Sequence, residues 1–115
     1  MHSNTDKPVC VIVGVGPGNG EALARTFADA GHAVALIARR HAFCEALAAQ
    51  LPDARAFACD ATDAIAVERT FAQIAKEMGD IATLVYNAGK GVWGAVDQVS
   101  ERDFEQAWRI NALGL

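Results

Sequence analysis

The sequence predicts an α/β fold: a doubly wound parallel sheet of about four strands, in the order 3-2-1-4, with helices on both faces. Short apolar stretches rich in β-branched residues alternate with longer stretches in which apolar residues recur every three or four positions. The first apolar stretch runs directly into a glycine-rich turn. This alternation implies βαβ units, whose right-handed crossovers favour the strand order given. Because the sequence shows no internal repeat, linker or low-complexity segment, we expect one domain.

The predicted strands are apolar runs too short to form helices. They are residues 9–14, 33–38, 54–59 and 81–86. The predicted helices lie between and after them, at residues 20–30, 41–51, 63–78 and 101–113. Ser100 and Asp103 have the spacing of a capping box at the start of the last helix. The apolar stripe of that helix comprises Phe104, Trp108 and Leu115.

The composition is that of a small globular protein. The 115 residues (12.1 kDa) suffice for a real core, since a chain of this size buries about two thirds of its unfolded surface. Apolar residues make up 52% and charged residues 21%, which excludes a disordered chain. The net charge of −4 argues against nucleic-acid binding, and no stretch approaches the roughly 20 apolar residues that span a bilayer. We therefore expect neither nucleic acid nor a membrane as a partner.

The cysteines predict neither a disulfide framework nor a metal site. Cys10, Cys44 and Cys59 are odd in number and widely spaced, without a Cys-x-x-Cys or Cys/His cluster. Residues 1–8 form a polar tail without a secretory apolar segment, so we assign the domain to residues 9–115. A cytoplasmic protein with reduced thiols is the expectation.

A glycine-rich turn, GVGPGNG at residues 14–20, joins the first strand to the first helix. Glycine lets a phosphate approach the main chain, and the helix start offers unpaired N–H groups and a positive dipole end. A tight turn without a ligand is the alternative. The spacing is Gly14-x-x-x-Gly18-x-Gly20, and not G-x-G-x-x-G, because position 19 is Asn.

This spacing resembles the nucleotide loop of the short-chain dehydrogenase/reductase family, T-G-x-x-x-G-x-G. Val13 stands here in place of the Thr, and Asn19 in place of the usual apolar residue. The resemblance implies a Rossmann-type fold that binds NAD(P). It places the following loop residues at the cofactor: Gly14, Gly16, Gly18, Asn19 and Gly20.

Arg39 and Arg40 follow the second strand, where a carboxylate often binds the adenosine 2′-hydroxyl. Two guanidinium groups can instead bind a 2′-phosphate, so we favour NADP, with NAD as the alternative. Arginines exposed at the start of the next helix are the other interpretation. Asp60, followed by Ala61, can accept a hydrogen bond from the adenine amino group or cap the helix that starts near Asp63. The resemblance implies the adenine contact.

Asn87-Ala88-Gly89, after the fourth strand, resembles the N-A-G motif of the family. The resemblance implies that these residues line the cofactor and brace the centre of the sheet. The preceding Tyr86 is the only tyrosine and stands four residues before Lys90. Because a strand-to-loop segment does not present the two side chains on one helical face, we do not expect a catalytic pair.

Asn111 lies seven residues after Phe104 on the predicted face of the last helix. A buried amide there would need hydrogen-bond partners, whereas a partly exposed Asn near a helix end would be ordinary. The segment RINALG resembles the N-x-x-G stretch of the family, whose Asn holds a water and a backbone kink in the proton relay. The resemblance thus implies a catalytic role for Asn111.

The chemistry that the resemblance implies is hydride transfer between NADP(H) and a carbonyl or alcohol substrate of unknown identity. The Ser, Tyr and Lys of the family lie beyond the helix where this sequence stops, and its two serines, Ser3 and Ser100, are not placed for this role. We therefore expect the cofactor-binding half of such an enzyme, as a truncated product or a fragment, inactive alone. Its fourth strand would be an exposed edge, which favours a homo-oligomer.

Two further interpretations stay open at this stage. One is a non-catalytic module that binds nucleotide or dimerises through Phe104 and Trp108, although both aromatics could equally belong to the core. The other is a fragment of an AdoMet-dependent methyltransferase, since Gly14, Gly16 and Gly18 match a G-x-G-x-G turn. Ile12 and Arg39 stand, however, where that fold requires acidic residues.

Overall fold

One parallel sheet forms the centre of the molecule. The structure, a computed structural model, describes residues 7–89 and 94–113. The sheet has the order β3-β2-β1-β4, which confirms the predicted order 3-2-1-4. Its strands are β1 (Val9–Val13), β2 (Ala33–Ala38), β3 (Ala54–Ala58) and β4 (Ile81–Tyr86). Each pairs in parallel with its neighbour.

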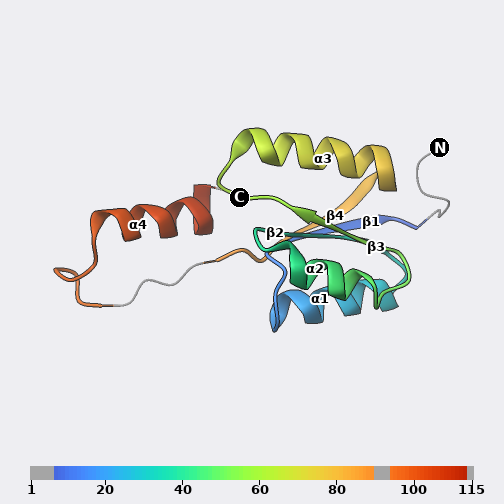
Figure 1. Ribbon diagram of the computed structural model, residues 1–115, viewed down its shortest axis with the longest axis horizontal. Helices are drawn as coiled ribbons and strands as arrows, with labels where there is room; N and C mark the ends of the chain where they lie inside the picture. The colour runs from blue at the N-terminus through green and yellow to red at the C-terminus, as the bar shows by residue number, and fades with distance from the viewer. Residues whose placement is uncertain (1–6, 90–93, 114–115) are drawn as a thin grey trace.

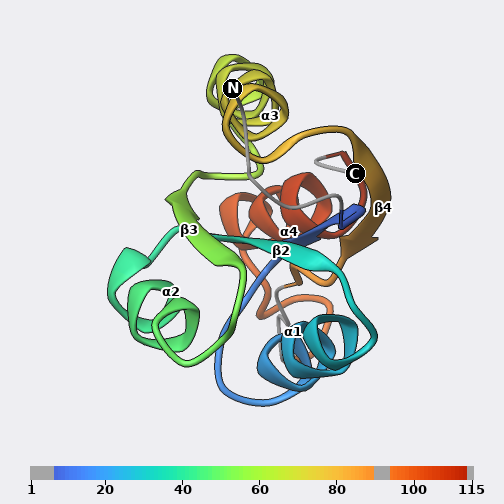
Figure 2. The ribbon, with the colours of Figure 1, turned by 90° about the vertical axis from the view of Figure 1, so that its right-hand side faces the viewer.

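Helices cover both faces of the sheet, as expected for a Rossmann-type fold (Figures 1 and 2). The helices of one face are α1 (Asn19–Asp29) and α2 (His41–Ala48), and the other face carries α3 (Ala64–Met78). Every residue of β1 is buried, because this strand lies in the middle of the sheet between both layers. Its side chains alternate: Val9 and Val11 join the core under α3, while Cys10 and Ile12 join the core under α1 and α2.

Several element ends differ from the prediction by one to three positions. Helix α2 ends at Ala48 and not at residue 51, because Pro52 disfavours helical geometry in the residue before it. Strand β1 ends at Val13, since Gly14 takes a φ of 95°. Asp63 caps α3: its Oδ1 accepts a hydrogen bond from the Ala66 amide at 3.1 Å. The sequence left open whether Asp60 caps this helix or contacts the adenine; since Asp63 is the cap, Asp60 does not cap the helix.

The last predicted helix is divided. Helix α4 (Glu101–Trp108) is followed by a π-helical turn, η1 (Arg109–Leu113). The Ser100 hydroxyl accepts a hydrogen bond from the Asp103 amide at 3.0 Å, which confirms its capping role. Phe104 and Trp108 are 70% and 49% exposed, since α4 lies beyond the carboxyl ends of the strands and outside the two layers (Figure 1). Leu115, the third residue of the predicted stripe, lies outside the described residues.

Strand β4 is an edge of the sheet, as predicted, with β1 as its neighbour on one side. Leu84 on this strand is 50% exposed. No helix in the described ranges combines the length and the apolar character that crossing a membrane requires.

Candidate functional site

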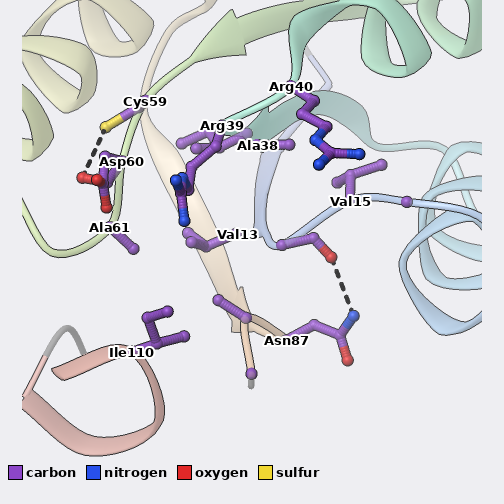
Figure 3. Close-up of a pocket in the computed structure, with 15 residues that line it drawn as sticks. Val13, Val15, Ala38, Arg39, Arg40, Cys59, Asp60, Ala61, Asn87 and Ile110 are labelled. Carbon is purple, nitrogen blue, oxygen red and sulfur yellow. Dashed lines mark hydrogen bonds between the residues drawn. The ribbon is translucent and has the colours of Figure 1, made fainter. Parts of the chain in front are cut away.

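A cleft of about 640 Å³ lies at the carboxyl ends of the strands (Figure 3). In an open α/β sheet this edge is where ligands bind, because loops from neighbouring strands converge there. Most of the predicted site residues line the cleft. They are Gly14, Gly16, Arg39, Arg40, Asp60, Ala61, Asn87, Ala88 and Gly89. The structure thus brings together residues from the ends of all strands of the sheet.

Some of the predicted site residues do not line the cleft, and some residues that line the cleft were not predicted. Gly18, Asn19, Gly20 and Asn111 do not line the cleft, and Asn19 is the first residue of α1. The lining residues that were not predicted as a site are Val13, Val15, Ile37, Ala38, Cys59 and Ile110. Most of these stand in or just after the last positions of β1, β2 and β3, so the rule that sites form at strand ends would have found them. Cys59 is 7% exposed and therefore also belongs to the core, as expected.

Gly14 and Gly20 are required by close backbone contacts. A Cβ atom on Gly14 would collide with the backbone nitrogen of Ala88 and lie 2.6 Å from its Cα atom. A Cβ atom on Gly20 would lie 2.7 Å from the carbonyl oxygen of Gly14. At Gly16 and Gly18, in contrast, no heavy atom of the described chain lies within 4 Å of the added atom. Gly14 and Gly20 therefore allow the loop to pack closely against neighbouring backbone, whereas Gly16 and Gly18 leave open space beside the backbone of the loop.

Backbone hydrogen bonds fix the loop at the edge of the sheet. The amides of Gly14 and Val15 both donate to the Ile37 carbonyl, at 2.8 and 3.1 Å. The N-cap residue of α1 is Gly18, and the described structure contains no side-chain cap for this helix. The Glu21 amide donates to the Gly16 carbonyl at 3.1 Å, so within the described chain the Asn19 and Gly20 amides are those available to an anion, which the helix dipole would favour.

Asn87 joins β4 to this loop. Its backbone amide donates to the Val13 carbonyl at 2.7 Å, and its side-chain Nδ2 donates to the Gly14 carbonyl at 3.0 Å. These bonds confirm that the Asn87-Ala88-Gly89 segment braces the centre of the sheet. They also explain why the backbone of Ala88 lies so close to Gly14.

Charged groups lie on the β2 and β3 side of the cleft. Arg39 extends into the space between Asp60 and Val13, and Arg40 extends towards Val15 (Figure 3). Both arginines are exposed, and within residues 7–89 and 94–113 neither is in an ion pair. Hydrogen bonds from the Thr62 hydroxyl and amide, at 2.7 and 2.9 Å, hold the pKa of Asp60 below its ordinary value, and Arg39 lowers it further against the effect of burial. The cleft therefore presents one ionised carboxylate and two guanidinium groups.

The described part of the C-terminal segment approaches the cleft through η1. The Tyr86 hydroxyl donates to the Ile110 carbonyl at 2.5 Å, and Ile110 lines the cleft. A Cβ atom on Gly89 would lie 3.4 Å from Oδ1 of Asn111, so the two residues are neighbours. Asn111 is exposed, because η1 lies outside the two layers of the fold, so of the two possibilities that the sequence left open the exposed Asn near a helix end is the one observed.

Tyr86 ends β4, as predicted, and Lys90 lies outside the described residues. Burial, together with the negative charge of Asp60, raises the pKa of the Tyr86 phenol. A tyrosine that acts as a general acid/base near neutral pH needs a shift in the opposite direction. The pKa shift of Tyr86 is thus not the one that a catalytic tyrosine needs.

Comparison with known proteins gives a consistent result. Residues 8–115 match the short chain dehydrogenase family. The chain is 39% identical to meso-2,3-butanediol dehydrogenase from Serratia marcescens and 34% identical to D-threitol dehydrogenase from Mycolicibacterium smegmatis. These alignments cover 96% and 95% of the chain but 45% and 44% of the relatives.

Solved structures agree with this match. A variant of a Serratia marcescens short-chain dehydrogenase/reductase superposes with a TM-score of 0.88 at 26% identity, over 93% of this chain and 46% of the other. The chain thus spans less than half the length of the proteins that it resembles. The family match also decides against the methyltransferase interpretation. The chain belongs to the short-chain dehydrogenase/reductase family.

Proposed function

We propose that this chain is the NADP-binding portion of an oxidoreductase that transfers a hydride between NADP(H) and a carbonyl or alcohol substrate. Members of the family use nicotinamide dinucleotides as cofactors. The observation that carries the proposal is the cleft in which the open glycine loop and the exposed Arg39 and Arg40 line the same space. A dinucleotide combines a diphosphate with a ribose, and NADP adds a 2′-phosphate, so these groups suit it.

The loop fits a diphosphate by shape. Because a Cβ atom would find open space at Gly16 and Gly18, a phosphate can approach the backbone there without steric conflict. The amide groups at the start of α1 would donate hydrogen bonds to it, and the helix dipole would stabilise its charge. Asn19 and Gly20 supply the first amides of this helix.

Other residues would hold the remaining parts of the cofactor. Arg39 and Arg40 would bind the 2′-phosphate, and Asp60, ionised at neutral pH, would accept a hydrogen bond from the adenine amino group beside Ala61. Asn87, Ala88 and Gly89 would line the other end of the cleft. When bound, the nicotinamide supplies the hydride chemistry. Asn111, next to Gly89, would hold a water molecule in the proton relay.

Fluorescence titration of the purified chain with NADPH and NADH tests the proposal. We expect the chain to bind NADPH more tightly than NADH. Replacing Arg39 or Arg40 by Ala should weaken NADPH binding about tenfold or more, the value of a charge-assisted hydrogen bond, with little effect on NADH. Arg55→Ala is the matched control, since Arg55 on β3 pairs with Glu77 at 3.0 Å and does not line the cleft. A folded chain that changes neither fluorescence signal would overturn the proposal.

Self-association is a second property that we propose. Leu84 on the edge strand and Phe104 and Trp108 on α4 are each about half exposed or more. Edge strands and exposed apolar patches favour pairing with another chain. Sedimentation with and without NADP should detect a homo-oligomer, and a monodisperse monomer under both conditions would contradict it.

A further inference from the structure

The phenol of Tyr86 joins the sheet to the π-helical turn η1. We propose that Tyr86 is a positioning residue whose hydroxyl holds η1 against the cleft, and thereby keeps Ile110 and Asn111 beside Gly89. The consequence for the cofactor rests on the proposed function. The hydrogen bond between the Tyr86 hydroxyl and the Ile110 carbonyl does not rest on the proposed function, because it is a contact within this chain.

The ring of Tyr86 has a fixed base. It stands at the last position of β4, where the backbone pairs with Val13 of the central strand. The side chain packs against the buried core cluster under α3, as do Val67 and Phe71. An aromatic side chain has two rotatable bonds, so a packed ring places its hydroxyl with little freedom. The hydroxyl is therefore a rigid donor that projects from the sheet.

The acceptor belongs to a segment with little burial of its own. No residue of α4 or η1 is buried within the described chain, and Phe104, Trp108 and Leu113 are large apolar residues that are about half exposed or more. A segment that buries few apolar contacts opens locally at low free energy. The hydrogen bond from Tyr86 to the Ile110 carbonyl, 2.5 Å long and 24 positions apart in sequence, connects this segment directly to the rigid sheet.

The turn that is held in this way forms one side of the cleft. Ile110 lines the cleft together with the glycine loop and the Asn87-Ala88-Gly89 segment. Asn111 lies next to Gly89, as the 3.4 Å approach of its Oδ1 to a Cβ at that position shows. Loss of the Tyr86 hydroxyl would therefore release the wall of the cleft that lies beside Asn111, without removing any group that lines it.

Hydrogen–deuterium exchange on the full chain tests whether the Tyr86 hydroxyl holds η1 in place. In Tyr86→Phe the ring stays packed but the donor is lost, so the protection of amides 109–113 should fall about three- to tenfold, as expected for one hydrogen bond. Protection of β1 and β2 should not change. Thr83→Val is the matched control: it removes a hydroxyl from the same strand, but Thr83 pairs with Cys10, about 10 Å before the end of the strand. Equal protection of residues 109–113 in wild type and Tyr86→Phe would overturn the proposal.

Nucleotide affinity gives a second measurement. Releasing the turn can weaken binding by no more than the factor by which it opens, so Tyr86→Phe should bind NADPH more weakly than the wild type, by at most about tenfold. Thr83→Val should bind like the wild type. If the wild type binds neither dinucleotide, the proposed function fails, and the exchange experiment still decides whether Tyr86 holds the turn.

The pH dependence separates a hydrogen-bond donor from a ring that only fills space. A phenolate cannot donate, so the wild type should lose protection of residues 109–113 as pH rises through the pKa of Tyr86, which burial and Asp60 raise above 10.0. Tyr86→Phe should show no such step. Among the described residues, Asp60 acts on the phenol electrostatically and Cys59 lines a small cavity with it, while Val67 and Phe71 from α3, which line the same cavity, carry no charge. Tyr86 is the only tyrosine, so the ultraviolet absorbance of the phenolate gives its pKa directly. Identical pH profiles for both proteins would contradict the proposal.

Discussion

The side-chain amide of Asn87 donates a hydrogen bond of 3.0 Å to the carbonyl oxygen of Gly14, 73 positions earlier in the chain. The backbone amide of Asn87 also donates to Val13, the last residue of β1. The end of β4 thus fixes the first turn of the glycine loop from the side opposite to β2, whose Ile37 carbonyl accepts from Gly14 and Val15. The position of the loop depends on two neighbouring strands, and not on its own glycines alone.

Replacing Asn87 by Ala should destabilise the fold by about 0.5–1.5 kcal/mol, because the carbonyl of Gly14 loses its side-chain donor. Urea denaturation measures the change. Gln73→Ala provides the control: its side chain donates to Glu77 at 2.7 Å on the exposed surface of α3, so its removal should cost less than about 0.5 kcal/mol. Equal stability of the Asn87→Ala variant and the wild type would show that the amide does not brace the loop.

Gly14→Ala should destabilise the fold by about 2 kcal/mol or more. The new methyl group would meet the backbone of Ala88 and Asn87, which cannot move aside as a flexible side chain would, and the φ of 95° is unfavourable for Ala. Thermal and urea denaturation measure the loss. A variant as stable as the wild type would contradict the close approach of these segments.

Gly16→Ala should behave differently from Gly14→Ala. No heavy atom of the described chain would contact the added methyl group, so stability should stay within about 0.5 kcal/mol of the wild type. If a phosphate approaches this backbone, NADPH affinity should nevertheless fall, because the methyl group occupies the space above the loop. Unchanged affinity in a stable Gly16→Ala variant would place the phosphate elsewhere.

Thr62→Val should raise the pKa of Asp60 towards its ordinary value of 3.8, because the hydroxyl hydrogen bond stabilises the carboxylate and is lost. A carboxylate whose pKa is lower in the folded state stabilises the fold above its ordinary pKa, and this contribution disappears as pH falls through the folded value. The variant should therefore be less stable than the wild type at neutral pH, and the difference should shrink in acid.

Carbon-detected NMR titration of the Asp60 carboxyl group measures this pKa, and urea unfolding at several pH values measures the stability. Thr26→Val is the control, since Thr26 is exposed and its hydroxyl donates to the Ala22 carbonyl of α1 and not to a carboxylate. The prediction is contradicted if Asp60 titrates identically in Thr62→Val and the wild type.

The strands, and most of the helices, could be predicted from local patterns. The apolar run VCVIV at Val9–Val13 is too short for a helix, and such runs are typical of central parallel strands. In the structure every residue of this strand is buried. The periodicity of residues 63–78 predicted α3, and Ile74 and Met78 do face the core. The helix predicted over residues 101–113 was wrong from Arg109 onward, because apolar spacing does not distinguish a π-helical turn from an α-helix.

Motifs predicted most of the residues that line the cleft, although Gly18, Asn19, Gly20 and Asn111 from the same motifs do not line it. The lining residues that belong to no motif were missed. Gly14, Arg39 and Asp60 stand in patterns that suggest phosphate and adenine, and the structure places them around one cleft. Ile37 and Ile110 line the same cleft but look like ordinary apolar residues in the sequence.

The sequence by itself determined the strand order, the glycine-loop spacing and the charged groups at the strand ends, because these follow from local periodicity and from the handedness of crossovers. Tertiary structure alone decided which glycines are tightly packed, that Asn111 is exposed, and that Tyr86 reaches Ile110. These features depend on contacts between segments that are far apart in sequence. Such contacts form when the sheet brings the segments together, so no local pattern encodes them.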